Sequence, residues 1–262
     1  MRQMMQSSND QLVPDSAPRL KSAELQANDP ELVDKWNGNA NVRALELEAN
    51  DDPAYRALTN LILRSASEHV VRESSILDAG CGLGYISNSL ARSGYRVTGI
   101  DPSGEQITYA ARKFPRVQFI CRTIEDYASA MREPLGYAAV IANMVLHTTP
   151  DLYSFLSSAK RLLIPGGYFV ATVPNPFSPK NTHGSLVDIS ATDGYLVRFQ
   201  IHDRDPHPEL VPHFPRDIGE YSEETYRAGF ENVHIATPPH VGPGRDYDIV
   251  VLFAFRPTSS EI

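Results

Sequence analysis

The run Leu77-Asp78-Ala79-Gly80-Cys81-Gly82-Leu83-Gly84 determines the architecture expected of this chain. It overlaps a short apolar segment, Ser75–Ala79, which we predict to be a strand, and it leads into a predicted helix over Tyr85–Ser93. Glycines let a backbone turn sharply and approach a ligand without interference from a Cβ atom. The start of the following helix favours negatively charged ligand groups. The pattern therefore predicts a strand, a glycine-rich binding loop and a helix, the opening unit of a nucleotide-binding α/β fold.

The acid in this run separates two classes of nucleotide ligand. A dinucleotide-binding loop has the pattern G-x-G-x-x-G and holds a pyrophosphate, whereas this loop reads D-x-G-x-G-x-G, with Asp78 at the end of the strand. A carboxylate there would repel a pyrophosphate. It would suit a ligand that brings an ammonium group to the loop, as the methionyl end of S-adenosylmethionine does. The loop therefore favours the sulfonium cofactor, and a nicotinamide dinucleotide is the alternative.

A second acid, Asp101, ends the second predicted strand, Arg96–Asp101. An acid at this place in a βαβ unit hydrogen-bonds ribose hydroxyls. Taken alone, Asp101 could equally be a turn acid, because Pro102 and Ser103 follow it. Its combination with the glycine-rich loop favours ribose binding. Ser103 is predicted to cap the next helix, with Gln106 completing a capping box.

The rest of the chain alternates between helical and strand-like periods. Helices are predicted over Tyr55–Val71, Asp151–Leu163 and a short segment capped by Ser222 that ends at Gly229. Further strands are predicted over Val117–Cys121, Tyr137–Asn143, Tyr168–Val173, Asn232–Ala236 and Ile249–Phe255. Strands separated by helices imply βαβ units and a mainly parallel sheet.

Residues 174–216 differ in character from this alternation. They are rich in proline and histidine and lack a clean period, except over Tyr195–Ile201, which could be a strand. We interpret them as an insertion that covers a site. The expected division of the chain is a disordered leader over 1–25, a lid helix over 26–55, a main domain over 56–256 that includes the inserted cap, and a tail over 257–262.

Composition restricts the class of protein further. The net charge of −8 argues against nucleic acid as the main partner, because phosphate backbones need a basic face. No segment approaches ~18 uninterrupted apolar residues, so we expect no membrane span, and the N-terminus lacks the apolar stretch of a signal peptide. Neither Cys81 and Cys121 nor the spacing of the histidines suggests a metal site. We therefore expect a cytoplasmic protein, monomeric or homodimeric, with no metal.

The chain resembles the class I S-adenosylmethionine-dependent methyltransferases of the small-molecule type. The motifs that carry the resemblance are LDAGCGLG, VTGID and LSSAKRLLIPGGYFVATVP. It implies a Rossmann-like fold, with a mainly parallel seven-stranded sheet, helices on both faces, an antiparallel last strand and a small cap. It also implies S-adenosyl-L-methionine as cofactor, S-adenosyl-L-homocysteine as product, and a small metabolite as acceptor through O or N. Protein or RNA methylation, and a protein of this fold that transfers no methyl group, are the alternatives.

The resemblance also assigns a set of cofactor contacts. The expected residues are Asp78, Gly80, Cys81, Gly82 and Gly84 around the methionyl part, Asp101 at the ribose, Pro102, Thr123 and Ile124 near the adenine, Asn143 through its backbone, and Trp36 in the lid. Thr123 stands where the family often has an acid toward the adenine amino group, so the Ile124 N–H is the ring contact that we expect. Trp36 could instead be the buried anchor of an exposed helix.

His147, in the run Asn143-Met144-Val145-Leu146-His147, lies at the methyl-transfer end of the site according to the resemblance. A hydroxyl or protonated nitrogen acceptor needs a route for its proton. We take His147 as the first candidate base and His202 as the second, with a packed structural histidine as the other reading of His147. The expected substrate-binding residues are His183, Tyr195, Arg198, Phe199 and His213. Such a lining suits a planar or aromatic small molecule.

Overall fold

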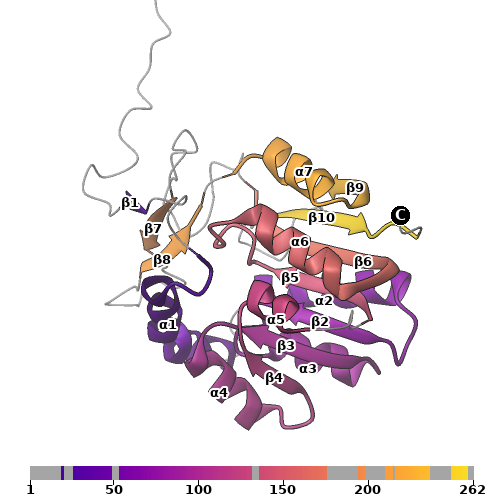
Figure 1. The fold of residues 1–262 in the computed structure, drawn as a ribbon. Coiled ribbons are helices and arrows are strands. Elements are labelled where there is room, and N and C mark those ends of the chain that lie inside the picture. The colour runs from indigo at the N-terminus through magenta and orange to yellow at the C-terminus, as the bar shows by residue number, and fades with distance from the viewer. Residues whose placement is uncertain are drawn as a thin grey trace, which may run out of the picture.

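A seven-stranded sheet forms the centre of the protein in the computed structural model (Figure 1). The structure describes residues 19–20, 26–48, 53–131, 136–175, 194–198, 210–214, 216–236 and 249–258. In spatial order the strands are β4 (Gln118–Cys121), β3 (Arg96–Asp101), β2 (Ser75–Ala79), β5 (Tyr137–Asn143), β6 (Leu163–Pro174), β10 (Ile249–Phe255) and β9 (Glu231–Ala236). Neighbouring strands from β4 to β6 pair in parallel. Only β10 runs the other way, antiparallel to both β6 and β9. The expected mainly parallel sheet with an antiparallel last strand is therefore confirmed.

Helices cover both faces of this sheet. The seven helices of the described residues are α1 (Pro30–Glu48), α2 (Pro53–His69), α3 (Tyr85–Arg92), α4 (Gly104–Lys113), α5 (Ile124–Ala130), α6 (Leu152–Leu162) and α7 (Ile218–Arg227). One core cluster joins α2 and α3 to the sheet, and a second joins α5, α6 and α7 to its other face. In Figure 1, α5, α6 and α7 lie in front of the strands, whereas α2 and α3 lie behind them.

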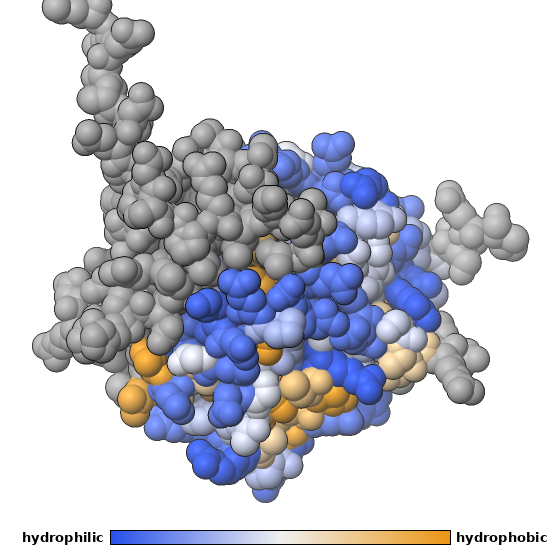
Figure 2. All heavy atoms as spheres, turned by 60° about the vertical axis from the view of Figure 1, so that its left-hand side comes forward, coloured by the Kyte–Doolittle hydropathy of each residue, from blue (hydrophilic) through white to orange (hydrophobic). Residues whose placement is uncertain are grey.

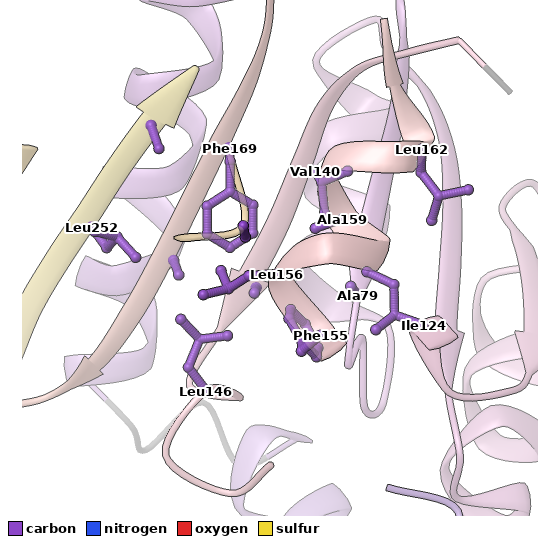
Figure 3. Close-up of a cluster of buried hydrophobic side chains, with 14 of the residues drawn as sticks. Ala79, Ile124, Val140, Leu146, Phe155, Leu156, Ala159, Leu162, Phe169 and Leu252 are labelled. Atoms are coloured by element: carbon purple, nitrogen blue, oxygen red, sulfur yellow. The ribbon is translucent and has the colours of Figure 1, made fainter. Parts of the chain in front are cut away.

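The packing of α6 illustrates why these residues form these elements. Its apolar side chains recur at helical spacing, so that Phe155, Leu156 and Ala159 fall on the buried face. Figure 3 shows them beside Val140 of β5 and Phe169 of β6. Because Leu156 is fully buried, truncating it to alanine should cost about 2–5 kcal/mol. This packing fixes the strands whose ends carry the site.

Two predicted helix starts need correction. Helix α7 begins at Ile218 and not near Ser222, because Asp217 and Glu220 form a complete capping box. At α4, Ser103 caps as expected by accepting from the Gln106 N–H at 3.3 Å. The reciprocal half of the predicted box is replaced, because the Ser103 N–H donates to Asp101 Oδ1 at 2.9 Å. Asp101, two residues earlier in the chain, thus takes the donor that the capping box would have used.

Three short strands form a separate antiparallel sheet, which we call the cap sheet. It comprises β1 (Arg19–Leu20), β7 (Gly194–Arg198) and β8 (Leu210–His213), in the order β1-β7-β8. The strand expected to start at Tyr195 is therefore present over β7. Two residues of the expected disordered leader form β1, so that expectation does not extend to them. Helix α1 contacts β8 and α4, and Figure 1 shows α1 and the cap sheet together at one end of the central sheet.

The described surface is mostly hydrophilic. Figure 2 shows hydrophilic residues over much of the face on which α1 lies, with separate apolar areas between them. The most exposed large apolar side chains of the described residues are Val71 and Leu45, at 80% and 69%. None of the helices in the described ranges combines the length and the apolar character needed to cross a bilayer.

Candidate functional site

The site lies where the parallel strands end. Asp78 is in β2, next to its last residue, and Asp101 and Asn143 end β3 and β5. Because β3, β2 and β5 are neighbours and run in parallel, their carboxyl ends meet at one edge of the sheet. In open α/β sheets this edge is where ligands bind. The order of the strands thus gathers the predicted loop and both predicted acids.

The glycine-rich loop is fastened to the end of β3 by backbone hydrogen bonds. The N–H groups of Gly80 and Cys81 both donate to the Ile100 carbonyl, at 2.8 and 2.9 Å. Gly80 has a φ of +74°, and a Cβ atom on it would lie 2.4 Å from Val145 Cγ2. A glycine is required there for two reasons, the backbone conformation and the close approach of the loop after β5.

Cys81 contributes packing through its side chain. Its thiol is buried, and a Cβ atom added to Gly99 of β3 would lie 3.0 Å from its sulfur. Burial raises the pKa of this thiol, with the charges of Asp101 and Asp78 adding to the effect. Only the backbone of Cys81 therefore belongs to the surface of the loop, and its expected cofactor contact is limited to main-chain atoms.

Asp78 is a buried carboxylate. It is 1% exposed, and Ser87 in the first turn of α3 donates its hydroxyl to Asp78 Oδ2 at 2.5 Å. Burial raises the pKa of Asp78 to about 6, the Ser87 hydrogen bond opposes this, and the neighbouring charge of Asp101 raises it further. A carboxylate in this position gains from a cationic ligand group, because such a group would compensate the buried negative charge.

Asp101 is held by the backbone on both sides. Its Oδ2 accepts from the Gly82 N–H at 2.9 Å and its Oδ1 accepts from the Ser103 N–H at 2.9 Å. Burial raises the pKa of Asp101 to about 6, and these two hydrogen bonds oppose the rise. Each carboxylate oxygen has further acceptor capacity. The side chain is thus oriented for a ligand that presents hydroxyl donors, such as a ribose.

Helix α1, the expected lid, is linked to the Asp101 carboxylate by hydrogen bonds through Ser103. Asn37 Oδ1 accepts from the Ser103 hydroxyl at 2.7 Å and from the Glu105 N–H at 3.4 Å. Ser103 in turn donates its N–H to Asp101. The neighbouring Trp36 is half-buried in α1. The lid is therefore docked beside the expected ribose position.

The expected adenine side is formed by the starts of α4 and α5. Thr123 caps α5 by accepting from the Asp126 N–H at 3.1 Å, and the Ile124 side chain is buried in the core. Glu125, in the first turn of α5, is only partly exposed. Its Oε2 has no hydrogen-bond partner among the described residues, and burial raises its pKa. On the same side of the site, the carbonyl of Pro102, after β3, accepts from the thiol of Cys121 at the end of β4, at 3.4 Å.

The loop after β5 begins with a fixed turn. Asn143 Oδ1 accepts from the Thr172 hydroxyl of β6 at 2.8 Å. Met144 has a φ of +57°, and its N–H donates to the Thr172 carbonyl at 2.9 Å. The Oδ1 of Asn143 is thus used within the protein, and a contact of its backbone with the methionyl group stays a prediction.

His147 and His213 face one another across this loop. Their ring centroids are 5.4 Å apart, and the N–H of Phe214 donates to the His147 carbonyl at 2.8 Å. His147 Nδ1 is buried without a hydrogen-bond partner among the described residues. Burial lowers the pKa of His147 well below its usual value, and the charges of His213 and Arg216 add to this. The pKa of His213 is lowered to about 4, by burial and by Arg216.

Arg216, which follows β8 of the cap sheet, holds the loop after β5 by hydrogen bonds. Its guanidinium donates to the carbonyls of Leu146, Thr149 and Pro150, at 2.9, 2.8 and 2.8 Å. It also lies over the Phe214 ring, 5.8 Å from the centroid. Burial lowers the pKa of Arg216. No sequence pattern singled out Arg216, because an isolated arginine before a helix has no recognisable pattern.

The structure brings together most of the predicted cofactor residues and two of the predicted acceptor-side residues. Three predicted residues, His183, Phe199 and His202, lie outside the described residues, and β7 places the backbone of Tyr195 and Arg198 in the cap sheet. Ser87 and Asn37 are partners of the expected site that the sequence did not single out for a role. Within the described ranges, no group of three or more His, Cys, Asp or Glu residues is arranged to hold a metal ion.

Comparisons with known proteins agree with this geometry. A family model described as "Methyltransferase domain" matches residues 77–171. The chain is 31% identical over 197 residues to a ubiquinone biosynthesis O-methyltransferase of Serratia proteamaculans, covering 72% of this chain and 78% of that relative. For a Yersinia pestis protein of the same name the identity is 29%, over 58% of this chain and 62% of the relative.

The fold is similar to that of a solved N-methyltransferase. The crystal structure of Burkholderia thailandensis 1,6-didemethyltoxoflavin-N1-methyltransferase, with 1,6-didemethyltoxoflavin and S-adenosylhomocysteine bound, superposes with a TM-score of 0.60. The two sequences are 20% identical, and the match covers 94% of this chain and 95% of that one. This structural similarity supports the fold, whereas the 31% identity to the Serratia relative shows the family.

Proposed function

The chain belongs to the class I S-adenosylmethionine-dependent methyltransferase family and is an enzyme of that kind, and on this premise we propose that it methylates a hydroxyl oxygen of a small molecule. The observation that carries the choice of oxygen is the buried Nδ1 of His147, which lies beside His213 and has no hydrogen-bond partner among the described residues. The curated relatives are named as O-methyltransferases, which supports the same choice.

The residues at the strand ends fit the cofactor. Asp78 is a buried carboxylate whose charge an ammonium group would compensate, and Asp101 is oriented to accept from ribose hydroxyls. We propose that Gly80, Gly82 and Gly84 with Cys81 surround the methionyl part through their backbones. Pro102, Thr123, Ile124, Asn143 and Trp36 complete the proposed cofactor-binding set.

The protein's own contribution to the reaction is alignment and removal of a proton. When bound, S-adenosylmethionine supplies a methyl group on a sulfonium, and the carbon–sulfur bond breaks with its electron pair left on sulfur as the methyl passes to the acceptor oxygen. We assign the hydroxyl proton of the acceptor to Nδ1 of His147. Because burial keeps this imidazole unprotonated at neutral pH, it is able to accept a proton. Such a base contributes about 10²–10⁴-fold to the rate.

The residues on the acceptor side favour a small molecule with a ring as the methyl acceptor. Phe214 is buried and its N–H donates to the His147 carbonyl, and Figure 1 shows the cap sheet with α1 at one end of the central sheet. We propose that the cap covers the acceptor, an arrangement that suits a small molecule better than a protein or RNA segment, which would need an open cleft. His183, Tyr195, Arg198, Phe199 and His213 are the proposed lining, and His202 is the second candidate base.

The test compares acceptors that differ only in the reacting atom. The enzyme is incubated with S-adenosylmethionine and phenol, catechol or aniline, and release of S-adenosylhomocysteine is measured. We expect release with the hydroxylated rings and a loss of about 10²-fold or more in kcat for His147→Asn, with unchanged binding of S-adenosylhomocysteine. His234→Asn, an exposed histidine on β9, is the matched control. Turnover of aniline alone, or full activity of His147→Asn, would overturn the proposal.

A further inference from the structure

We propose that Arg216 is a positioning residue of the acceptor site, which holds His147 for proton removal by joining the loop after β5 to the cap. The inference rests on the proposed function, because His147 is its target. Arg216 itself is assigned no contact with the cofactor or the acceptor.

The first step of the argument is the hydrogen-bond pattern. Arg216 donates to the carbonyls of Leu146, Thr149 and Pro150, which bracket His147 on both sides. A planar guanidinium presents several donors in a fixed fork. Three bonds from one rigid group therefore fix the course of the loop, whereas a flexible ammonium would hold it at a single point.

The second step is the connection to the cap. Arg216 directly precedes Asp217, the N-cap residue of helix α7, and it follows β8 of the cap sheet after two residues. Its guanidinium lies over Phe214, and the Phe214 N–H donates to the His147 carbonyl at 2.8 Å. The cap is thus tied to His147 through the backbone and through one side chain. A movement of β8 would be transmitted to the imidazole by both routes.

The third step is the charge. Burying a guanidinium is costly unless it is paired, yet the ion pairs among the described residues do not include Arg216. The groups that act on it electrostatically are Tyr221, Glu220 and Asp151, with Tyr221 also a side-chain hydrogen-bond partner, and the guanidinium is partly buried. The charged and titratable groups that face His147 are Arg216 and His213. A positive charge that forms no ion pair among the described residues thus lies beside both imidazoles. It disfavours their protonation and so favours the neutral state, which a base requires.

Two substitutions separate the geometric from the electrostatic part of this role. Arg216→Lys keeps the charge and removes the fork, so kcat should fall about tenfold or more while the pH dependence of kcat/KM stays in place. Arg216→Met removes both the positive charge and the guanidinium fork. The titration midpoints of His147 and His213, followed by NMR of the imidazoles in the S-adenosylhomocysteine complex, should then move to higher pH, and the acid limb of the kcat/KM profile should move with them.

Controls keep the outcomes distinct. Arg227→Met removes a more exposed arginine of α7 and should change neither the titrations nor kcat. Binding of S-adenosylhomocysteine should be unchanged in every variant. Unmoved imidazole titrations in Arg216→Met, or a loss of cofactor affinity as large as the loss in kcat, would overturn the inference. If Arg216→Met does not fold, Arg216→Lys decides alone, because full kcat in that variant contradicts the positioning role. The NMR result needs no acceptor, so it stands apart from any failure of the O-methylation assay.

Discussion

Gly82 donates its backbone N–H to Asp101 Oδ2 at 2.9 Å, which joins the glycine-rich loop directly to the end of β3. The other oxygen of the same carboxylate holds the first residue before α4, Ser103. One side chain thus organises both backbone segments between which the cofactor is expected. Its loss should affect the shape of the site as well as any contact with a ribose.

Replacing Asp101 by asparagine should weaken binding of S-adenosylhomocysteine by about tenfold to a hundredfold, since hydrogen bonds to charged groups contribute about 1.5–3 kcal/mol. The amide has one oxygen, so one of the two backbone donors loses its acceptor. Isothermal titration calorimetry measures the change, with Asp126→Asn, an exposed acid on α5, as the control. Equal affinities for the wild type and Asp101→Asn would contradict this assignment.

Cofactor affinity should depend on pH near 6. Burial raises the pKa values of Asp78 and Asp101 to about 6, and each must be ionised to hold an ammonium or a ribose. Below this value, affinity for S-adenosylhomocysteine should fall by up to about tenfold per pH unit for each acid that must lose its proton.

In the ligand-free protein, the contribution of these two acids to folding stability should fall as pH rises, whereas cofactor affinity rises. Their folded-state pKa values lie above the ordinary aspartate value of 3.8, so the folded state binds more protons between that value and about 6. Their contribution to stability is therefore lost as pH rises through this window. Thermal shifts with and without S-adenosylhomocysteine measure the difference, which should flatten in Asp78→Asn. A pH-independent shift would show that neither acid titrates there.

Gly80→Ala should destabilise the enzyme through a clash as well as through its backbone conformation. The new Cβ atom would lie 2.4 Å from Val145 Cγ2, and a left-handed φ costs a non-glycine residue about 1–2 kcal/mol. Gly94→Ala is the matched control, because it shares a positive φ and its Cβ atom meets nothing within 4 Å. Denaturant unfolding should show the larger loss for Gly80→Ala, partly recovered when Val145→Ala is added. Equal losses in the two alanine variants would rule out the clash.

Asn37→Ala should loosen the lid helix. It removes the acceptor for the Ser103 hydroxyl and the Glu105 N–H, a loss of about 0.5–1.5 kcal/mol for a hydrogen bond. Amide exchange in α1 should become faster, as measured by mass spectrometry, and cofactor affinity should fall. Asn60→Ala, at an exposed position of α2, should leave both unchanged. Unaltered exchange in α1 would show that other contacts dock the lid.

Local patterns predicted the inner strands of the central sheet well because β2, β3 and β5 are largely apolar runs that are mostly buried. The expected bounds of β2, β3, β5 and β10 agree with the structure, and the ends of β2, β3 and β5 bring Asp78, Asp101 and Asn143 to the same edge. The positive φ of Gly80, Gly82 and Gly84 follows from the motif itself. The cofactor side could therefore be predicted from short stretches of sequence.

The remaining features depend on contacts that a local periodicity does not reveal. Gln106 fits a capping box by spacing, but Asp101, two residues before Ser103, supplies the competing acceptor for the Ser103 N–H. Glu125 has the pattern of a solvated helix start, and its burial comes from tertiary packing. Arg216 acquires its role only when the loop after β5 folds against it. Such partners are invisible to any periodicity, which is why the acceptor side was predicted less completely.

The pairing of Arg19 in β1 with Tyr195 in β7 ties the beginning of the polypeptide to its last third. Contacts between segments so far apart in sequence close large loops and form slowly. The sheet that carries the cofactor loop assembles from nearer neighbours, so it should mature earlier during folding. Removing residues 1–24 should then leave affinity for S-adenosylhomocysteine unchanged while it removes β1, the edge strand of the cap sheet that we propose to cover the acceptor.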